Sequence, residues 1–179
     1  YPEHSSILNF PIIGTCGQLE QIIAQENIID VFIAIGDNKK RLKMMNDTQL
    51  LGLTCPNLIH PTAVISSFAS LGQGILVMPQ ASINCMASVD DACIINTAAV
   101  IEHDCVLEKG VHVSPNATLA GGVTVGQTSW IGINSAVKEK IQIGRNVIVG
   151  AGAVVINNVQ DDQTVVGVPA KQITIYERG

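Results

Sequence analysis

The chain has 179 residues, of which 47% are hydrophobic, 14% are charged and only 3% are aromatic. Its 10 Lys and Arg against 15 Asp and Glu give a net charge of −5, which argues against a nucleic-acid surface because phosphate binding needs clustered cations. No apolar run approaches the roughly 18 residues of a membrane span, and no signal peptide opens the sequence. The five cysteines are odd in number and form no CxxC pair, so reduced, buried thiols in a cytoplasmic protein are expected.

Residues 1–57 predict a small, partial α/β domain. Helical spacing runs from Gly17 to Gln25, and Ile29–Ile35 is a continuous apolar stretch suited to a buried parallel strand. Gly36-Asp37-Asn38 then forms a turn with a good helix cap, and a helix is expected from about Asn38 to Leu51. Its first turns carry four cations, which favour an anion near the helix start: Lys39, Lys40, Arg41 and Lys43.

Residues 58–179 contain a strict repeat with a period of six. Sixteen aliphatic residues follow one another at this spacing: Ile65, Leu71, Val77, Ile83, Val89, Ile95, Ile101, Leu107, Val113, Leu119, Val125, Ile131, Val137, Ile143, Val149 and Val155. Four positions after each aliphatic residue comes a small or β-branched residue. Three positions after the aliphatic residue, half of the frames have Gly or Asn. Because Gly and Asn tolerate a left-handed backbone, each frame indicates a short strand and a corner. The pattern predicts a parallel β-solenoid whose stacked coils form the core.

This pattern resembles that of the hexapeptide-repeat acyltransferases, whose fold is a left-handed parallel β-helix with three frames per coil. The resemblance supplies the handedness, since the period does not and the general crossover rule favours the opposite hand. With three frames per coil, residues eighteen apart are stacked, and one outward column is mostly apolar: Ile94, His112, Trp130 and Ile148. Such a stripe, on a prism without a cleft of its own, favours a symmetric oligomer with pockets between subunits. The resemblance makes this oligomer a homotrimer.

His103 occupies a corner of the predicted solenoid and therefore projects outward. Gly121 stacks over it, with Gly122 alongside, which predicts open space where a reacting group can approach. Asp104 stands at the turn position, where strand alternation lapses, so its carboxylate can reach back to the imidazole. There it would fix the tautomer of His103 and stabilise the imidazolium. From the residues alone, a catalytic base and a surface histidine paired with an acid are about equally supported.

Other histidines and cysteines leave alternatives open. His112 lies below Trp130 in the apolar column, and the residues alone favour an interface histidine there. Cys85 and Cys105 occupy frame positions close to His103, so a cysteine nucleophile activated by this histidine is one hypothesis. Packing is nevertheless the favoured role for both cysteines. The two outward histidines also allow the hypothesis of a metallohydrolase of the carbonic-anhydrase type, which has this solenoid fold. The repeats, however, offer no third ligand to complete its metal site. A non-catalytic scaffold is a further alternative.

Longer motifs sharpen the resemblance. They are Ile95-Asn-Thr, Ile101-Glu-His-Asp-Cys-Val, His112-Val-Ser-Pro, Leu119-Ala-Gly-Gly-Val-Thr-Val-Gly, Gly132-Ile-Asn-Ser, Val149-Gly-Ala-Gly-Ala-Val-Val and Val166-Gly-Val-Pro-Ala-Lys. Together with Val31-Phe-Ile-Ala-Ile-Gly-Asp-Asn and Ile59-His-Pro, they cover nearly the whole chain. In these motifs the chain is similar to the sugar O/N-acyltransferases of the NeuD/PglD type, which include UDP-4-amino-sugar acetyltransferases.

The resemblance implies roles for five residues in acyl transfer from acetyl-CoA. His103 would be the general base, and Asp104 would tune it. His112, with the backbone near Ile133 and Ala151, would contact acetyl-CoA, and no metal is implied. Asp104 stands where some members have Glu, which shortens the reach to the imidazole.

The resemblance also divides the chain and assigns a substrate. Residues 1–57 would be a partial Rossmann-like domain that binds a nucleotide sugar, with Gly36 matching a glycine of that site. Residues 58–179 would be the β-helix acyltransferase domain. Family members open with a strand and a Gly-rich, His-containing loop that is not found among these residues. The expected activity is N-acetylation of a UDP-4-amino-sugar; the alternative is O-acetylation of sialic acid or another sugar.

Overall fold

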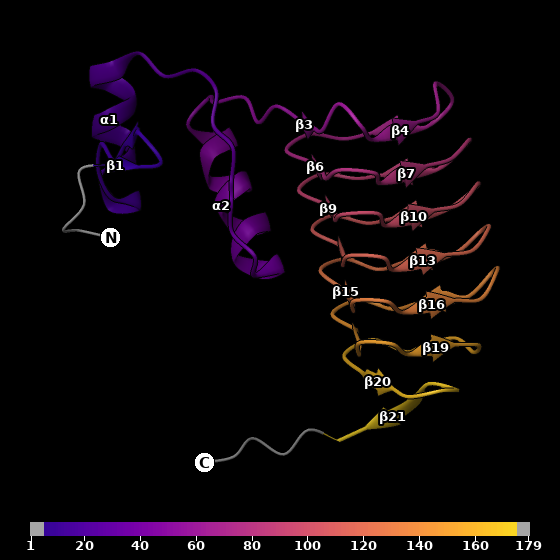
Figure 1. Ribbon diagram of the computed structural model, residues 1–179. Helices are drawn as coiled ribbons and strands as arrows, with labels where there is room; N and C mark the ends of the chain where they lie inside the picture. The colour runs from indigo at the N-terminus through magenta and orange to yellow at the C-terminus, as the bar shows by residue number, and fades with distance from the viewer. Residues whose placement is uncertain (1–5, 175–179) are drawn as a thin grey trace.

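The computed structural model describes residues 6–174. It begins with an antiparallel hairpin of β1 (Ser6–Ile7) and β2 (Phe10–Pro11), followed by the 3₁₀ turn η1 (Cys16–Gln18), α1 (Leu19–Glu26) and α2 (Asn38–Leu50). Both predicted helices therefore form. The remaining strands wind into a stack of coils, and α2 lies beside the upper coils (Figure 1). No helix within residues 6–174 is long and apolar enough to cross a membrane.

Three sheets form the faces of the stack. The six-stranded sheet contains β4 (Val64–Ile65), β7 (Ser82–Ile83), β10 (Val100–Ile101), β13 (Thr118–Leu119), β16 (Ala136–Val137) and β19 (Val154–Val155). The five-stranded sheet contains β5 (Ser70–Leu71), β8 (Ser88–Val89), β11 (Val106–Leu107), β14 (Thr124–Val125) and β17 (Gln142–Ile143). The eight-stranded sheet contains β3 (Leu58–Ile59), β6 (Leu76–Val77), β9 (Ile94–Ile95), β12 (His112–Val113), β15 (Trp130–Ile131), β18 (Ile148–Val149), β20 (Thr164–Val166) and β21 (Lys171–Ile173).

Residues eighteen apart are paired in the coils from β3 to β19. Ile101, for example, pairs in parallel with Leu119, and His112 pairs with Trp130. Three six-residue frames therefore make one coil. This arrangement confirms the predicted fold class, which is mainly β with a left-handed parallel β-helix and an α/β region before it.

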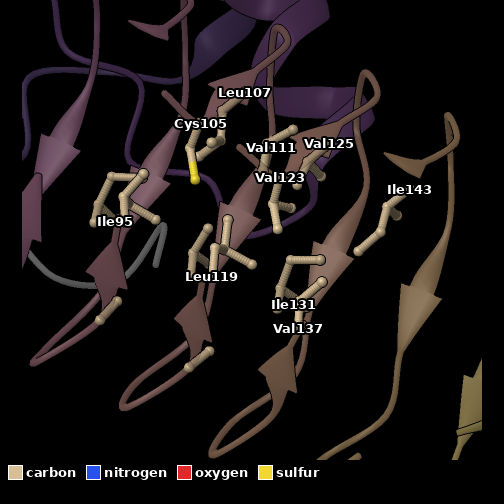
Figure 2. Packing of buried hydrophobic residues seen from close by; sticks show 14 of the residues in the cluster. Ile95, Cys105, Leu107, Val111, Leu119, Val123, Val125, Ile131, Val137 and Ile143 are labelled. Atoms are coloured by element: carbon tan, nitrogen blue, oxygen red, sulfur yellow. The ribbon is translucent and has the colours of Figure 1, made fainter. Parts of the chain in front are cut away.

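The aliphatic residue that opens each frame points toward the middle of the coil. From Val77 to Val155, all of these residues are at most 3% exposed. Figure 2 shows such side chains, including Ile95, Leu119 and Ile131, gathered inside the coils, one coil after another. The small residues four positions later, such as Ala99, are buried with them. Each coil alone would leave this apolar surface in water, so stacking is what stabilises the fold.

A residue with a left-handed backbone turns each corner from Gly74 to Gly152. Positive φ occurs at Gly74, Gln80, Met86, Ala92, Ala98, Asp104, Gly110, Asn116, Gly122, Thr128, Asn134, Lys140, Asn146 and Gly152. Gly and Asn adopt this conformation easily, as predicted. The other residue types pay roughly 1–2 kcal/mol for it. The hydrogen-bonded ladders on both sides of a corner therefore impose the turn even where the residue does not favour it.

The last coil departs from the six-residue period. Val159 makes an isolated bridge with Ile143, and Val165 pairs with Val149, so the paired residues here are sixteen apart instead of eighteen. β20 then returns to the eight-stranded sheet, and β21 pairs with β20 in antiparallel orientation. The repeat alone did not indicate this antiparallel ending.

The strand expected at Ile29–Ile35 does not form. Asp30 makes one parallel bridge with Thr54, and no other ladder involves this stretch among residues 6–174. Its apolar side chains pack on the solenoid instead. Ile33 belongs to a second buried cluster with Leu42, Met45, Cys55 and Ala92. A strand needs a neighbouring strand to satisfy its backbone, and here the coils provide only an apolar surface.

α2 begins at the predicted residue, but one of the cations in its first turns, Arg41, is buried instead of facing an anion. Asp37 is the N-cap, and its carboxylate accepts a hydrogen bond from the Lys40 backbone N–H at 2.8 Å. The buried stripe of the helix consists of Asn38, Arg41, Leu42, Met45 and Thr48. Arg41 is 2% exposed and bonds to backbone carbonyls, so it is not available to an anion as expected. Lys39 and Lys40 remain exposed.

Candidate active site

His103 lies at the corner between the six-stranded and five-stranded sheets, just after β10. Its side chain is 58% exposed, as a corner position predicts. Asp104 turns the corner with φ of 59°, and this conformation directs its carboxylate back along the chain. Asp104 Oδ2 lies 2.7 Å from His103 Nδ1. The contact expected between these two side chains is therefore present.

Gly121, one coil further on, is the surface against which the His103 ring lies. A Cβ atom on Gly121 would stand 2.5 Å from both Nε2 and Cε1 of His103, which is closer than real Cβ contacts allow. The expected open space above His103 is thus wrong in one respect, because the imidazole itself fills the space that Gly121 leaves. The Gly122 N–H also donates to the His103 carbonyl at 2.8 Å. Gly121 therefore sets where the imidazole lies, and Gly122 holds the backbone of His103.

The Asp104 contact decides which ring nitrogen of His103 is free. An ionised carboxylate can only accept, so the hydrogen sits on Nδ1 and is donated to Asp104. Nε2 is left with its lone pair. An exposed imidazole held in one tautomer by a carboxylate can accept a proton from a reacting group, which is what a general base does.

His112 lies on the eight-stranded sheet in a much more enclosed setting. It is 8% exposed, and its ring stacks on Trp130 with centroids 5.1 Å apart. Asn96 Oδ1 accepts the Thr97 backbone N–H at 2.8 Å, so the Asn96 amide nitrogen must face the histidine. That nitrogen lies 3.1 Å from His112 Nε2 and donates to it. The hydrogen of the neutral His112 ring is therefore on Nδ1.

His112 is neutral and carries a buried donor without a partner. Burial, and secondarily the charge of Arg41, lower the pKa of His112 to about 4. Nδ1 is buried, yet no acceptor for it exists among residues 6–174. An unpaired buried donor costs about 1–3 kcal/mol. This N–H is thus suited to an acceptor, such as a carbonyl oxygen, that comes from outside these residues.

The other predicted site residues lie on different edges of the prism. Ile133 and Ala151 are at the corner between the eight-stranded and six-stranded sheets, which is the opposite edge of the six-stranded sheet from His103. Gly36 is exposed and precedes α2, where residues 32–36 line an apolar cavity of about 170 Å³ together with Leu76 and Ile94. One chain therefore groups Gly36, His112, Ile133 and Ala151 around the eight-stranded sheet and leaves His103 apart from them.

The apolar column expected to bind a partner is partly covered by the chain itself. Ile94 is 9% exposed, and residues 32–36 lie beside it. Trp130 and Ile148, further along the column, remain 42% and 44% exposed. The second half of the column therefore offers most of its exposed apolar surface.

Two of the buried cysteines, Cys93 and Cys105, are poor candidates for a nucleophile. Cys93 and Cys105 are buried, and burial raises the pKa of the Cys93 thiol to about 12 and also raises that of Cys105. A thiol in this state holds little of the reactive thiolate. Cys85 and Cys16 are exposed, which corrects the expectation that all the thiols are buried. No group of three His, Cys, Asp or Glu side chains that could hold a metal ion occurs within the described part of the chain.

Three residues that organise these surroundings were missed from the sequence. Asn96 sets the tautomer of His112 from one coil away. Arg41 and Asn38 fasten α2 to the corners of the solenoid, with Asn38 Nδ2 donating to the Thr128 carbonyl at 3.0 Å. The available signal was the spacing of Asn38 and Arg41, which places two polar side chains in the same helical stripe as Leu42.

Comparison with known proteins identifies the family. A family model described as bacterial transferase hexapeptide (six repeats) matches residues 122–157. The structure of PerB from Caulobacter crescentus, solved in complex with CoA and GDP-perosamine, has a TM-score of 0.92 and 38% identity, covering 95% of this chain and 82% of that one. The acetyltransferase domain of PglB from Neisseria gonorrhoeae has a TM-score of 0.91 and 38% identity, with the same coverage of 95% and 82%.

Curated relatives match over shorter stretches. Serine acetyltransferase from Synechococcus elongatus is 43% identical over 56 residues, which are 31% of this chain and 22% of that protein. The chain thus spans less than a third of the length of the curated relatives it matches. The two solved structures, in contrast, match along nearly the whole chain, and they confirm the predicted enzyme class, an acyltransferase. The chain belongs to the hexapeptide-repeat sugar O/N-acyltransferases of the NeuD/PglD type.

Proposed function

We propose that this protein transfers the acetyl group of acetyl-CoA to the amine of a nucleotide-linked 4-amino sugar. The observation that carries the proposal is the His103 ring, which Asp104 and Gly121 hold in one orientation with Nε2 free to accept a proton. The relatives support the co-substrate, since PerB is solved with CoA and the PglB domain is also solved with acetyl coenzyme A. UDP is the proposed nucleotide, and GDP is the first alternative because PerB holds GDP-perosamine.

His103 acts as the general base. The sugar amine attacks the thioester carbonyl carbon, and Nε2 of His103 accepts the proton that the nitrogen loses. Asp104 stabilises the resulting imidazolium through its hydrogen bond to Nδ1. When the C–S bond breaks, the electron pair leaves with the CoA sulfur, and the imidazolium can return the proton to the thiolate. No covalent enzyme intermediate is needed.

His112, Ile133 and Ala151 contact acetyl-CoA. The unpaired Nδ1–H of His112 supplies a donor for a carbonyl oxygen of the cofactor, and its low pKa keeps the ring neutral around pH 7. Trp130 and Ile148 offer exposed apolar surface on the same sheet for the pantetheine arm. Gly132 and Gly150, just before Ile133 and Ala151, let successive coils approach closely at this corner, because a Cβ at either position would clash with the next coil. Gly36 contacts the nucleotide sugar.

Two copies of the chain complete one site. His103 is on one edge of the six-stranded sheet, and the acetyl-CoA contacts lie on and beyond its other edge. In a ring of copies, the edge with His103 in one copy can meet the edge with the acetyl-CoA contacts in the next copy. This arrangement brings His103 and the acetyl-CoA contacts together, with the six-stranded sheets turned toward the ring axis. Uncharged residues line the outer face of this sheet, which suits such packing: Ser82, Val100, Thr118, Ala136 and Val154. We take the ring to be a homotrimer.

An acceptor panel tests the reaction. Purified protein is incubated with acetyl-CoA and, separately, a UDP-4-amino-sugar, GDP-perosamine, sialic acid or no acceptor, while release of free thiol is followed. The proposal expects turnover with a nucleotide-linked amino sugar and an N-acetyl product by mass spectrometry. Acetylation of sialic acid alone would establish the O-acetyltransferase alternative. Absence of both acetyl-CoA binding and turnover would leave the scaffold interpretation.

Mixed oligomers test the two-chain site. His103→Ala damages one edge of the six-stranded sheet and Ile133→Glu damages the other, so each variant alone is expected to be inactive. When the two are co-expressed at equal levels, about a quarter of the junctions combine two intact edges, and activity returns to a comparable fraction of wild type. If both halves of the site belonged to one chain, no mixture would regain activity. Light scattering on the same samples gives the number of copies.

A further inference from the structure

Arg41 is the buried cation of the α2 stripe, and every one of its donors is used. Nε donates to the Ala92 carbonyl at 2.8 Å. Nη1 donates to the Ile35 carbonyl at 3.0 Å and the Gly36 carbonyl at 3.1 Å. Nη2 donates to Asn38 Oδ1 and to the Gly110 carbonyl, both at 2.9 Å. These five bonds satisfy the five N–H groups of a guanidinium.

The acceptors of Arg41 belong to two different parts of the molecule. Ala92 and Gly110 are corner residues of successive coils, eighteen residues apart, and both have the left-handed backbone, with φ of 56° and 72°. Their N–H groups are used within the corner, donating to the carbonyls of Gln73 and Asp91. Their own carbonyls accept from the guanidinium. Ile35 and Gly36 belong instead to the segment that leads into α2. Arg41 therefore joins this segment to a rigid corner of the solenoid.

The positive charge of Arg41 has no carboxylate partner. Within residues 6–174 no Asp or Glu lies at salt-bridge distance from it, so four backbone carbonyls and the Asn38 side-chain oxygen solvate the charge. Burying a cation in this way is costly, and burial lowers the pKa of Arg41. Packing of α2 alone could be achieved by an apolar residue such as the neighbouring Leu42, which is 6% exposed in the same interface. The guanidinium provides a fixed geometry that an apolar side chain does not.

We propose that Arg41 is a positioning residue for the nucleotide sugar, holding the backbone of Ile35 and Gly36 at a set place against the solenoid. This inference rests on the proposed function, in which Gly36 contacts the nucleotide. Arg41 itself is buried beneath the segment and does not touch the substrate. A flexible segment would have to be ordered by each substrate molecule, whereas a segment already fixed by Arg41 binds without that cost.

Arg41→Lys tests this role because a lysine keeps the charge but offers only three donors on a flexible stem. We expect the KM for the nucleotide sugar to rise on the order of tenfold, since at least two hydrogen bonds are lost. The kcat and the KM for acetyl-CoA should change less than threefold. A separate measurement does not need turnover: hydrogen exchange of the amides in residues 31–37 should quicken, while exchange in the strands of the solenoid stays as in wild type.

Leu42→Ala is the matched control. It weakens the same interface of α2 with the solenoid but leaves all five bonds of Arg41 in place. Its melting temperature should fall while its KM for the nucleotide sugar stays near wild type. The proposal is overturned if both variants raise this KM equally, or if Arg41→Lys leaves exchange in residues 31–37 unchanged. Wild-type protein without any acetyl transfer would contradict the proposed function, whereas the exchange result would still decide whether Arg41 fixes the segment.

Asn38→Ala provides a second variant in case Arg41→Lys does not fold. It removes one acceptor of Arg41 and the bonds from Asn38 to the carbonyls of Thr128 and Ser129, but keeps the guanidinium under Gly36. We expect the same selective effect at smaller size, a rise of about threefold in the KM for the nucleotide sugar. An equal change in the KM for acetyl-CoA would count against the proposal.

Discussion

The solenoid and the N-terminal region achieve burial in opposite ways. In the coils, each frame buries an aliphatic residue and a small residue at the same two positions, and the contact is repeated from one coil to the next. In residues 6–57, burial depends on single contacts, such as Arg41 with the corner carbonyls and Met45 against Gly74. A repeated contact tolerates variation in any one frame, whereas a contact made once has no substitute.

The candidate site follows the same division. His103 and Asp104 are on a corner of the solenoid, where the surrounding ladder already fixes the backbone and the side chains are free for chemistry. Gly36 is in the N-terminal region, and its position depends on a single buried guanidinium. We therefore expect substitutions at the corner to affect catalysis without affecting the fold, and substitution of Arg41 to affect both the local structure under α2 and the binding of the nucleotide sugar.

The largest effect is expected from His103→Ala. Loss of the general base should lower kcat by about 10² to 10⁴. The side chain is more than half exposed, so the melting temperature should change little. The check is a steady-state assay beside a thermal melt, with Gln127→Ala, an exposed corner residue of another column, as the control. Turnover near wild type in His103→Ala would remove this residue from the mechanism.

Gly121→Ala should give the next largest effect. Its Cβ would meet the His103 ring, so the imidazole must move, and a displacement of about 1 Å can cost on the order of 10²-fold in kcat. The backbone at Gly121 has no positive φ, so the fold should survive. Glu139→Ala, at the same position one coil further on, is the control for the assay. Unchanged kcat in Gly121→Ala would mean that the ring orientation is not required.

Two core substitutions compare the regions directly. Leu119→Ala and Met45→Ala each remove a nearly fully buried side chain, so each should cost about 2–5 kcal/mol of unfolding free energy. In Leu119→Ala the whole solenoid should melt at a lower temperature. In Met45→Ala the loss should stay local, with faster protease cleavage in residues 28–57 and an unchanged solenoid transition. Equal shifts of the main transition would show that the two regions unfold as one unit.

The smallest expected effect is the loss of folding stability at low pH that His112 causes. His112 has a pKa of about 4 in the folded chain against 6.5 when unperturbed, so the unfolded chain binds the proton first as the pH falls. Its contribution is complete above pH 6.5 and is lost progressively between there and pH 4. Urea unfolding at pH 7.5 and pH 5 should therefore show a larger loss of stability for wild type than for His112→Gln. Equal losses would contradict a buried, neutral His112.

Part of the site was predictable because it depends on local position. The six-residue frame places His103 at a corner and Asp104 at the left-handed turn residue, and the turn conformation brings the carboxylate to the imidazole. The burial of Cys105 also follows from its place in the frame. The pairing of Asn96 with His112 was not predictable in this way, since it joins side chains of two coils through their rotamers.

The N-terminal region shows the other limit. The start of α2 follows from Asp37 as its cap, but the destination of Arg41 does not, because it depends on how the helix docks against carbonyls some fifty to seventy residues away. The apolar run at Ile29–Ile35 predicts burial correctly and strand pairing wrongly. Burial depends on composition, whereas pairing depends on which backbone lies alongside.

The amino-acid sequence by itself determines the coil, because the inward residue and the small residue of each frame recur at fixed spacing and every coil needs the next to bury them. It also determines which residues stand at the corners. The tertiary structure alone decides that the His103 ring fills the space above Gly121, that His112 keeps an unpaired donor, and that Arg41 ties the segment before α2 to the solenoid. These contacts join residues of different coils or regions, so they exist only once the parts are stacked and docked.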